Sequence, residues 1–178
     1  LTLNAIERRL DQLLPNPSER EKVSLAMREG TLTPGKRIRP LLLLLTAKDL
    51  GYQSSQQGLL DFACAIEIVH AASMIMDDMP CMDNALLRRN QPTVHRKFGE
   101  AVALLAGVAL VSKAFQIISQ AEGISDSAKN LAVGELTQAI GVQGLVEGKY
   151  QALSEGHNPR SPEPIAMNNH CTTMTLVS

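Results

Sequence analysis

The stretch QQGLLDFACAIEIVHAASMIMDD, residues 56–78, is apolar on almost every face until it ends in two aspartates. A helix that is apolar all round belongs in the centre of a fold. We therefore predict a buried helix over Gln56–Met76 as the core of the protein. The two aspartates then fall at its C-terminal end, where the helix dipole is already negative and further negative charge is unfavourable without cations.

The segments on either side of this stretch are also predicted to be helical. Leu, Ala, Met and Gln are abundant, and aromatic residues make up only 3% of the 178 residues, a composition that favours helix. Apolar residues at helical spacing, bounded by Pro and Gly, predict helices over Leu3–Leu14, Ser18–Glu29, Pro40–Leu50, Glu100–Glu122, Asp126–Val146 and Glu163–Val177. Ser18 is the expected N-cap of the second of these, and Gly30 its end. We expect one all-α domain over residues 1–178.

The composition excludes several classes of protein. A net charge of −1 argues against a nucleic-acid binder, which normally carries a basic excess. The LLLLL run at 41–45 is too short to span a bilayer, and the first residues do not resemble a signal peptide, so no transmembrane segment is expected. The three cysteines (Cys64, Cys81, Cys171) form no CxxC pair, which suits a reduced, cytoplasmic protein.

Charged residues cluster directly after the predicted central helix. Asp77, Asp78 and Asp83 are followed by Arg88 and Arg89. One interpretation is a solvated helix end with ion pairs, which are common and weak at surfaces. The more specific interpretation is a Mg²⁺ site, because Mg²⁺ is typically held by one or two carboxylates together with substrate phosphates.

The spacing of the aspartates requires a break in the helix. Asp83 lies six residues after Asp77, which is about 240° around a straight helix. Pro80 prevents a straight helix, because it lacks a backbone donor and clashes with the preceding turn. We expect a kink or loop over residues 79–82 that swings Asp83 back toward Asp77.

A second basic segment, TPGKRIRP at 33–40, lies upstream. Lys36, Arg37 and Arg39 precede a predicted helix start, where free backbone N–H groups favour anions. A solvated basic turn is the simpler alternative. His70 lies two helical turns before Asp77 and therefore on the same face; taken alone, it is more typical of a hydrogen-bonded core histidine.

Three segments together resemble one family: GKRIRP at 35–40, EIVHAASMIMDDMPCMD at 67–83 and LLRRNQPTVHRKFGEAVALLAG at 86–107. They resemble the trans-isoprenyl diphosphate synthases, the polyprenyl synthetase family of prenyltransferases. Among these they are most similar to bacterial geranylgeranyl and farnesyl diphosphate synthases of isoprenoid and carotenoid biosynthesis. The resemblance runs from about residue 30 to 155. It implies an all-α isoprenoid synthase-type bundle around a central cavity, a homodimer, and Mg²⁺-dependent condensation of isopentenyl diphosphate with allylic diphosphates.

The resemblance also implies roles for individual residues. The motif that holds Mg²⁺ on the allylic diphosphate would comprise Asp77, Asp78 and Asp83, with Asp77 and Asp83 as the direct ligands. Arg88 matches the arginine that binds the allylic diphosphate. The residues that match the isopentenyl diphosphate site are Lys36, Arg39, His70 and Arg89.

Small residues before the aspartates bear on product length. Ala72 and Ser73 lie five and four residues before Asp77, and five residues of helix are about 7.5 Å. In the family an aromatic side chain near this depth goes with short products, so Ala72 favours the C20 geranylgeranyl product over the C15 farnesyl product. The alternative is that Ala72 merely packs against a neighbouring helix.

The sequence also departs from the family. The second aspartate-rich motif of the family does not occur in these 178 residues, and Cys171 stands near the place of a usual lysine. Lys149, Ala152 and Asn90 replace a usual Gln, Asp and Gly; Asn is tolerable because it adopts the left-handed conformation. We expect this chain alone to be weak or inactive, either as part of a longer enzyme or as a non-catalytic partner subunit. A terpene cyclase is disfavoured because it holds no isopentenyl diphosphate.

Overall fold

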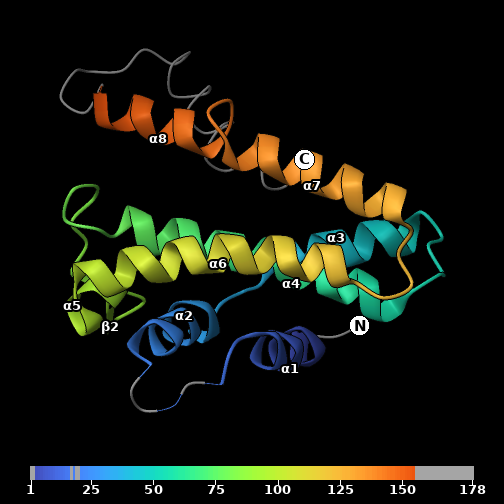
Figure 1. The fold of residues 1–178 in the computed structure, drawn as a ribbon, viewed down its shortest axis with the longest axis horizontal. Helices are drawn as coiled ribbons and strands as arrows, with labels where there is room; N and C mark the ends of the chain where they lie inside the picture. The colour runs from blue at the N-terminus through green and yellow to red at the C-terminus, as the bar shows by residue number, and fades with distance from the viewer. Residues whose placement is uncertain (1–2, 17, 19–20, 155–178) are drawn as a thin grey trace. The chain divides into compact units, whose positions relative to one another are not determined.

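The computed structural model describes residues 3–16, 18 and 21–154, which are mostly helical (Figure 1). The chain divides into two compact units, Leu1–Ile124 and Ser125–Ser178. The first contains α1 (Leu3–Leu13), α2 (Lys22–Leu32), α3 (Ile38–Asp49), α4 (Gln56–Asp77), β1 (Leu87–Arg88), β2 (Gln91–Pro92), α5 (Val94–Phe98) and α6 (Glu100–Gln120). The second contains α7 (Asp126–Ile140) and α8 (Leu145–Ser154). The all-α prediction is confirmed; that of a single domain stays a prediction.

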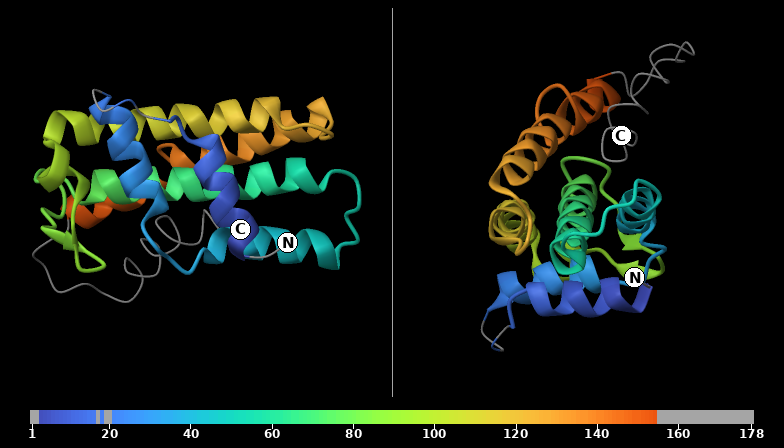
Figure 2. Two further views of the ribbon diagram at one scale, coloured as in Figure 1. Left: turned by 90° about the horizontal axis from the view of Figure 1, so that it is seen from below. Right: turned by 90° about the vertical axis from the view of Figure 1, so that its right-hand side faces the viewer.

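Helix α4 is the centre of the first unit, as predicted. It packs against α6, α3, α1 and α2 (Figure 2). The side chains of Ala63, Ala65 and Ile68 are fully buried, and Ala72 is 1% exposed. Small residues let neighbouring backbones approach on several sides at once, and burial of an apolar surface on every side is the main favourable term in folding. The helix ends at Asp77, one residue later than expected.

A glycine of α6, Gly107, makes room for the Met76 side chain of α4. A Cβ on Gly107 would lie 2.9 Å from Cε of Met76, closer than ordinary van der Waals contact. Ala103, Ala106 and Leu110 of α6 are fully buried and recur at helical spacing. This close approach brings α6 alongside the part of α4 that leads to the aspartates.

An ion pair joins α1 to α4. Arg9 donates from Nε to Oδ1 of Asp61 at 2.6 Å and from Nη2 to Oδ2 at 3.1 Å. The Asp61 side chain is 8% exposed, so the pair is largely removed from water. Ile6 and Leu10 of α1 are fully buried beside it. The N-terminal helix is therefore fastened to the core by both apolar and charged contacts.

Helix α2 differs from its predicted bounds at both ends. It begins at Lys22 instead of Ser18, with Glu21 at the N-cap position, and it continues past Gly30 to Leu32. A Cβ on Gly30 would lie 3.0 Å from Cγ1 of Ile75. Gly30 therefore permits close packing of α2 on α4 and does not end the helix, which is why the prediction was wrong.

Further helix boundaries were also predicted wrongly: α1 ends at Leu13 instead of Leu14, and α6 ends at Gln120 instead of Glu122. Helix α3 begins at Ile38, so that Pro40 stands in its first turn, where no intrahelical donor is needed. The helix expected over Asp126–Val146 is broken after Ile140. A Cβ on Gly144 would lie 2.7 Å from the carbonyl carbon of Ala139, and the chain turns there before α8. The helix expected over Glu163–Val177 lies outside the described residues.

Two helices of the described part have the length and apolar composition of a membrane span, α4 and α6. Within the most apolar window, 67% of α4 and 39% of α6 is buried inside the fold. A mostly buried apolar helix is also what the core of a helical bundle contains, so this is weak evidence for a membrane. The expectation of no transmembrane segment stays a prediction.

Candidate functional site

The turn after α4 folds Asp83 back beside Asp77. The amide of Asp83 donates to the carbonyl oxygen of Asp77 at 2.9 Å, and the amides of Met82 and Asn84 donate to that of Met79 at 2.9 and 3.0 Å. These bonds close a compact turn around Pro80. The predicted break over residues 79–82 is confirmed, and it places the main chains of the two aspartates next to each other.

A two-stranded hairpin that was not predicted follows this turn. Leu87 pairs with Pro92 and Arg88 with Gln91 in an antiparallel ladder. The two residues between the strands, Arg89 and Asn90, have φ of 51° and 63°. Two left-handed residues make the turn that matches the twist of a hairpin. The left-handed conformation expected at Asn90 is confirmed, but the strands are too short for their pattern to be recognised in the sequence.

The hairpin is closed at its base by Thr93. Its Oγ1 donates to the carbonyl oxygen of Ala85 at 2.8 Å, and its amide donates to that of Leu86 at 3.2 Å. Oγ1 also lies 3.1 Å from Nδ1 of His95. Because the hydroxyl of Thr93 donates its proton to the carbonyl oxygen of Ala85, Nδ1 of His95 must be the donor to Oγ1 in the second hydrogen bond. The sequence did not indicate that Thr93 and His95, which are both buried, hold the base of the hairpin that carries Arg88 and Arg89.

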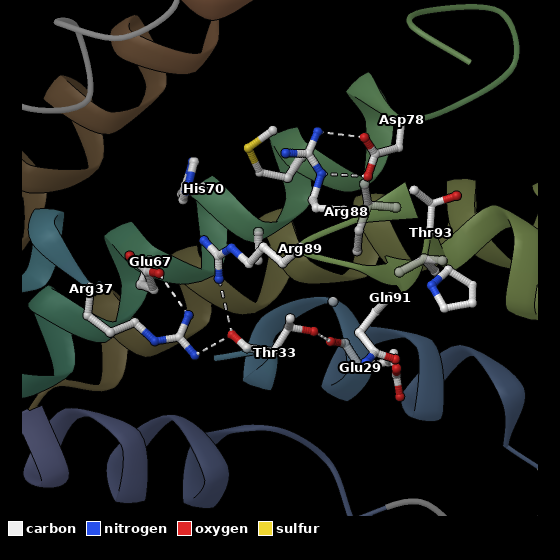
Figure 3. A pocket seen from close by; sticks show the side chains of 16 residues that line it. Glu29, Thr33, Arg37, Glu67, His70, Asp78, Arg88, Arg89, Gln91 and Thr93 are labelled. Atoms are coloured by element: carbon white, nitrogen blue, oxygen red, sulfur yellow. Dashed lines mark hydrogen bonds and ion pairs between the residues drawn. The ribbon is translucent and has the colours of Figure 1, made fainter. Parts of the chain in front are cut away.

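Arg88 forms a two-pronged ion pair with Asp78 (Figure 3). Nε donates to Oδ2 at 2.8 Å and Nη2 donates to Oδ1 at 2.6 Å. Asp78 is 3% exposed, and its hydrogen bond raises the pKa of Arg88. Part of the ion-pair interpretation of this helix end is therefore correct: Asp78 neutralises Arg88 and holds it at the end of α4.

Arg89 reaches in the other direction, to the loop between α2 and α3. Its Nη1 donates to the carbonyl oxygens of Thr33, at 3.3 Å, and Pro34. A Cβ on Gly35 would lie 3.0 Å from Cζ of Arg89, so a side chain at position 35 would displace this guanidinium. The glycine that precedes the basic residues thus lets the hairpin lie against their loop.

The basic residues of that loop have different environments. Arg37 is buried and donates from Nη1 to Oε1 of Glu67 at 2.9 Å, so the structure pairs it with a carboxylate that was not predicted. Lys36 is exposed. Nε of Arg39 is buried and has no hydrogen-bond partner among the described residues, and burial lowers the pKa of Arg39. Arg39, in the first turn of α3, is partly exposed, and its buried Nε has capacity for an anion.

A pocket lies between α2, α4 and the hairpin (Figure 3). Its polar side chains include five from the residues discussed above: Arg37, Glu67, His70, Arg88 and Arg89. Asp78 and Glu29 complete the charged lining, whereas Ala71, Met74, Ile75 and Val94 form an apolar part of the wall. Asp77, Asp83, Lys36 and Arg39 do not line this pocket.

Three of the predicted substrate-binding arginines act on His70. Burial lowers its pKa from 6.5 to about 4, and the next causes are the charges of Arg39, Arg89 and Arg88. These arginines come from two separate segments of the chain. Around neutral pH the imidazole is uncharged, so it can either donate or accept a hydrogen bond within a cluster of positive charge.

The candidate metal ligands are a pair of carboxylates. Among the described residues, no group of three or more His, Cys, Asp or Glu side chains is arranged to hold a metal ion. Mg²⁺ keeps several waters and is commonly bound by one or two carboxylates plus phosphates. Asp77 and Asp83 supply hard carboxylate oxygens from main-chain positions that a backbone hydrogen bond joins, so the residue types present suit that requirement.

Ala72 and Ser73 are inside the packing of α4. Ser73 is 7% exposed and donates from Oγ to the carbonyl oxygen of His70 at 2.8 Å. A Cβ on Gly107 of α6 would lie 3.9 Å from the carbonyl oxygen of Ala72. Neither residue lines the charged pocket. Their control of product length stays a prediction.

Comparison with known sequences gives one family and close relatives. The model of the family described as polyprenyl synthetase matches residues 20–169. A geranylgeranyl diphosphate synthase of Pantoea ananas is 64% identical over 96% of this chain and 57% of its own length. A second, of Pseudescherichia vulneris, is 53% identical over 98% of this chain and 57% of its own length. The chain thus spans little more than half the length of these relatives.

Solved structures give the same fold. The crystal structure of an FPP/GFPP synthase from Zymomonas mobilis has a TM-score of 0.90 and 35% identity, over 97% of this chain and 63% of its own. That of a geranyltransferase from Legionella pneumophila has a TM-score of 0.89 and 29% identity, over 97% of this chain and 61% of its own. The expected isoprenoid synthase-type bundle is confirmed for the part that the chain covers.

The ion pair at the end of α4 can be tested with Asp78→Asn. The change leaves the Arg88 guanidinium partly buried opposite a neutral amide, and we expect the free energy of unfolding to fall by about 1–3 kcal/mol. Urea denaturation measures the loss. Asp49→Asn, at the exposed end of α3, is the control and should change stability by less than about 0.5 kcal/mol. Equal effects of the two changes would contradict the structural role of the pair.

The buried imidazole predicts a pH dependence. His70 has a folded-state pKa below its unfolded value of 6.5, so its contribution to stability is complete above pH 6.5 and is lost as the pH falls toward 4. Between pH 6.5 and 4 the imidazole of His70 is protonated in the unfolded chain but not in the folded chain. We expect His70→Gln to flatten the fall in stability over this range. Urea unfolding at several pH values measures it, and an NMR titration of His70 near pH 6.5 in the parent chain would contradict it.

Proposed function

Because this chain belongs to the polyprenyl synthetase family, we propose that it carries the substrate-binding part of a prenyltransferase. The proposed reaction condenses isopentenyl diphosphate with an allylic diphosphate, and the proposed product is the C20 compound, geranylgeranyl diphosphate. The main support is the pocket of Figure 3, in which Arg88, Arg89 and the neutral His70 meet at the end of a buried apolar helix. Two relatives named geranylgeranyl diphosphate synthase support the choice of product.

The pocket has the chemistry that a diphosphate needs. Guanidinium groups bind phosphate oxygens through paired, charge-assisted hydrogen bonds. Arg88 is proposed to serve the allylic diphosphate, and Arg89 with His70 to serve isopentenyl diphosphate. Lys36 and Arg39 are proposed to complete this second site, and the effect of the Arg39 charge on the pKa of His70 supports this proposal.

Magnesium is proposed as the cofactor. Asp77 and Asp83 would hold it, because they supply hard carboxylate oxygens from adjacent points of the main chain. Bound there, Mg²⁺ would supply positive charge that offsets the charge of the departing diphosphate. Asp78 is proposed to act on Arg88, with which it is paired, and not as a direct ligand.

The proposed condensation separates charge and then rejoins two carbon skeletons. The C–O bond of the allylic diphosphate breaks, and its electron pair leaves with the diphosphate. The double bond of isopentenyl diphosphate then forms a C–C bond with the allylic cation, and a proton is lost from the neighbouring carbon. Positive groups fixed near the leaving oxygens stabilise the developing negative charge. The apolar wall of Ala71, Met74 and Ile75 would limit the access of water that could capture the cation.

A homodimer and a cytoplasmic setting complete the proposal. Leu104, Leu105 and Val108 of α6 are each more than half exposed, and Val108 lies about one turn after the two leucines, which gives a second copy an apolar surface to bury. The cysteine pattern supports a reducing compartment. Two alternatives remain: farnesyl diphosphate as the product, and a non-catalytic subunit of the same fold.

The proposal is tested on polypeptide purified from its natural source, with its intact mass compared with 19.3 kDa. We expect Mg²⁺-dependent formation of a C20 diphosphate from isopentenyl and farnesyl diphosphates, which EDTA abolishes. Arg88→Gln should lower kcat/KM for the allylic substrate by about 100-fold or more, since it removes a group fixed at the developing charge. Lys48→Gln, an exposed cation of α3, is the control and should leave kcat/KM within about twofold. Diphosphate binding without condensation would favour the subunit alternative.

Product length is tested at Ala72. A phenyl ring at this position, about 7.5 Å before Asp77, should block the lengthening chain and shift the product of the same preparation from C20 toward C15. Mass spectrometry of the products measures the shift. Ala63→Phe is the matched control, because Ala63 is equally buried but lies nine residues earlier, about 180° around the helix. An unchanged product in a folded Ala72→Phe variant would show that Ala72 does not control product length.

A further inference from the structure

The guanidinium of Arg37 is enclosed by groups from three parts of the fold. Nε donates to Oε1 of Glu7 in α1 at 2.7 Å, and Nη1 donates to Oε1 of Glu67 in α4 at 2.9 Å. Nη2 donates to the carbonyl oxygen of Thr33 at 3.1 Å and to Oε2 of Glu7 at 3.3 Å. All three nitrogens are engaged, and the Arg37 side chain is 3% exposed. This arginine therefore has little capacity left for a substrate anion.

The backbone of Arg37 is unusual at the same place. Its φ is 48° and its ψ is 41°, in the left-handed region that is unfavourable for a residue with a Cβ. Arg37 stands at the N-cap position of α3 without a side-chain cap, and its carbonyl oxygen accepts from the amide of Leu41. The ion pairs must therefore hold a backbone conformation that the chain would not otherwise favour. That conformation sets the course of the main chain between Lys36 and Arg39.

The two carboxylates that hold Arg37 are not equivalent. The Glu7 side chain is 36% exposed, whereas that of Glu67 is 6% exposed. Glu67 lines the pocket one helical turn before His70, and its charge also acts on Arg39, whose pKa it raises against the effect of burial. A buried carboxylate interacts more strongly with its neighbours than one in contact with water. Glu67 is thus placed to influence both the conformation of the loop, through Arg37, and the charge of Arg39 at the start of α3.

We propose that Glu67 is a positioning residue: through Arg37 it holds residues 33–39 in the conformation in which Lys36 and Arg39 bind isopentenyl diphosphate. Arg37 itself is not a ligand of the diphosphate. The inference rests on the function proposed above. It assigns opposite roles to two arginines that are two residues apart, one neutralised by carboxylates and one whose Nε lacks a hydrogen-bond partner in the described chain.

The test compares Glu67→Gln with the parent polypeptide by calorimetric titration, using isopentenyl diphosphate and geranyl diphosphate with Mg²⁺ as separate probes. Gln keeps the shape and one acceptor but removes the charge. We expect the Kd for isopentenyl diphosphate to rise about tenfold, and that for geranyl diphosphate to stay within about twofold. In a preparation that is catalytically active, the KM for isopentenyl diphosphate should rise in the same way, and the KM for geranyl diphosphate should stay unchanged.

Asp61→Asn is the matched control. It removes the charge of another buried carboxylate of α4, which pairs with Arg9 away from the pocket. It should lower the melting temperature by a similar amount and leave both Kd values within about twofold. Arg37→Gln alone should weaken isopentenyl diphosphate as Glu67→Gln does, and the double variant should be no worse than either single one, because both act through one interaction.

Three outcomes overturn the proposal. If Glu67→Gln weakens both probes equally, or neither, the residue has only a structural role. If the double variant loses the sum of the single losses, Arg37 binds the diphosphate directly. If the parent chain binds neither probe, the proposed function fails and this inference fails with it. Should Glu67→Gln not fold, Glu67→Asp and Arg37→Gln provide the same comparison.

Discussion

The burial of α4 on every side is the constraint on which the rest of the first unit depends. A helix with so few polar positions can be stable only if other helices cover it, and α1, α2, α3 and α6 do so. The electrostatically unfavourable part of this arrangement is the C-terminal end of α4. Two carboxylates stand there against the negative end of the helix dipole, and Asp78 is almost fully buried. A positive partner is therefore required at this end, and the hairpin supplies Arg88.

Each arginine around the pocket has its own electrostatic environment. Arg88 is neutralised by Asp78 and Arg37 by Glu67 and Glu7, whereas Arg89 donates only to uncharged carbonyl oxygens in the described structure. Arg39 lies nearby with a buried Nε that has no hydrogen-bond partner there. A site that must bind anions needs positive charge that is not cancelled, and it needs rigid supports for that charge. The ion pair with Asp78 fixes Arg88 in place and leaves its Nη1 without a hydrogen-bond partner among the described residues, and Arg89 and Arg39 add positive charge. Burial lowers the pKa of His70, and the charges of Arg39, Arg89 and Arg88 lower it further.

The similarity to geranylgeranyl diphosphate synthases concerns the part of those proteins that the chain spans. Over that part the identity is 64% and 53% to two bacterial relatives, and a solved synthase superposes with a TM-score of 0.90. The pocket, the hairpin and the turn of the aspartates all lie within residues 29–94 and thus within the range that the family model matches. The described residues include several cations that are proposed to bind diphosphates, but only two carboxylates, Asp77 and Asp83, that are proposed to bind the metal. Substrate binding is therefore the more direct functional proposal for these residues, and turnover the broader one.

The sequence by itself determined the helical class, the central helix and the break at Pro80, and it predicted four residues that line the pocket, His70, Asp78, Arg88 and Arg89. These depend on local properties: apolar periodicity, the missing donor of proline, and charges close together along the chain. The tertiary structure alone decided which cation meets which carboxylate. Arg37 and Glu67 are thirty residues apart, and only the packing of the helices shows that Arg37, one of three basic residues of its segment, forms a buried ion pair. Gly30 was misread for the same reason: its lack of a side chain serves a contact with Ile75, distant in sequence, that no local pattern records.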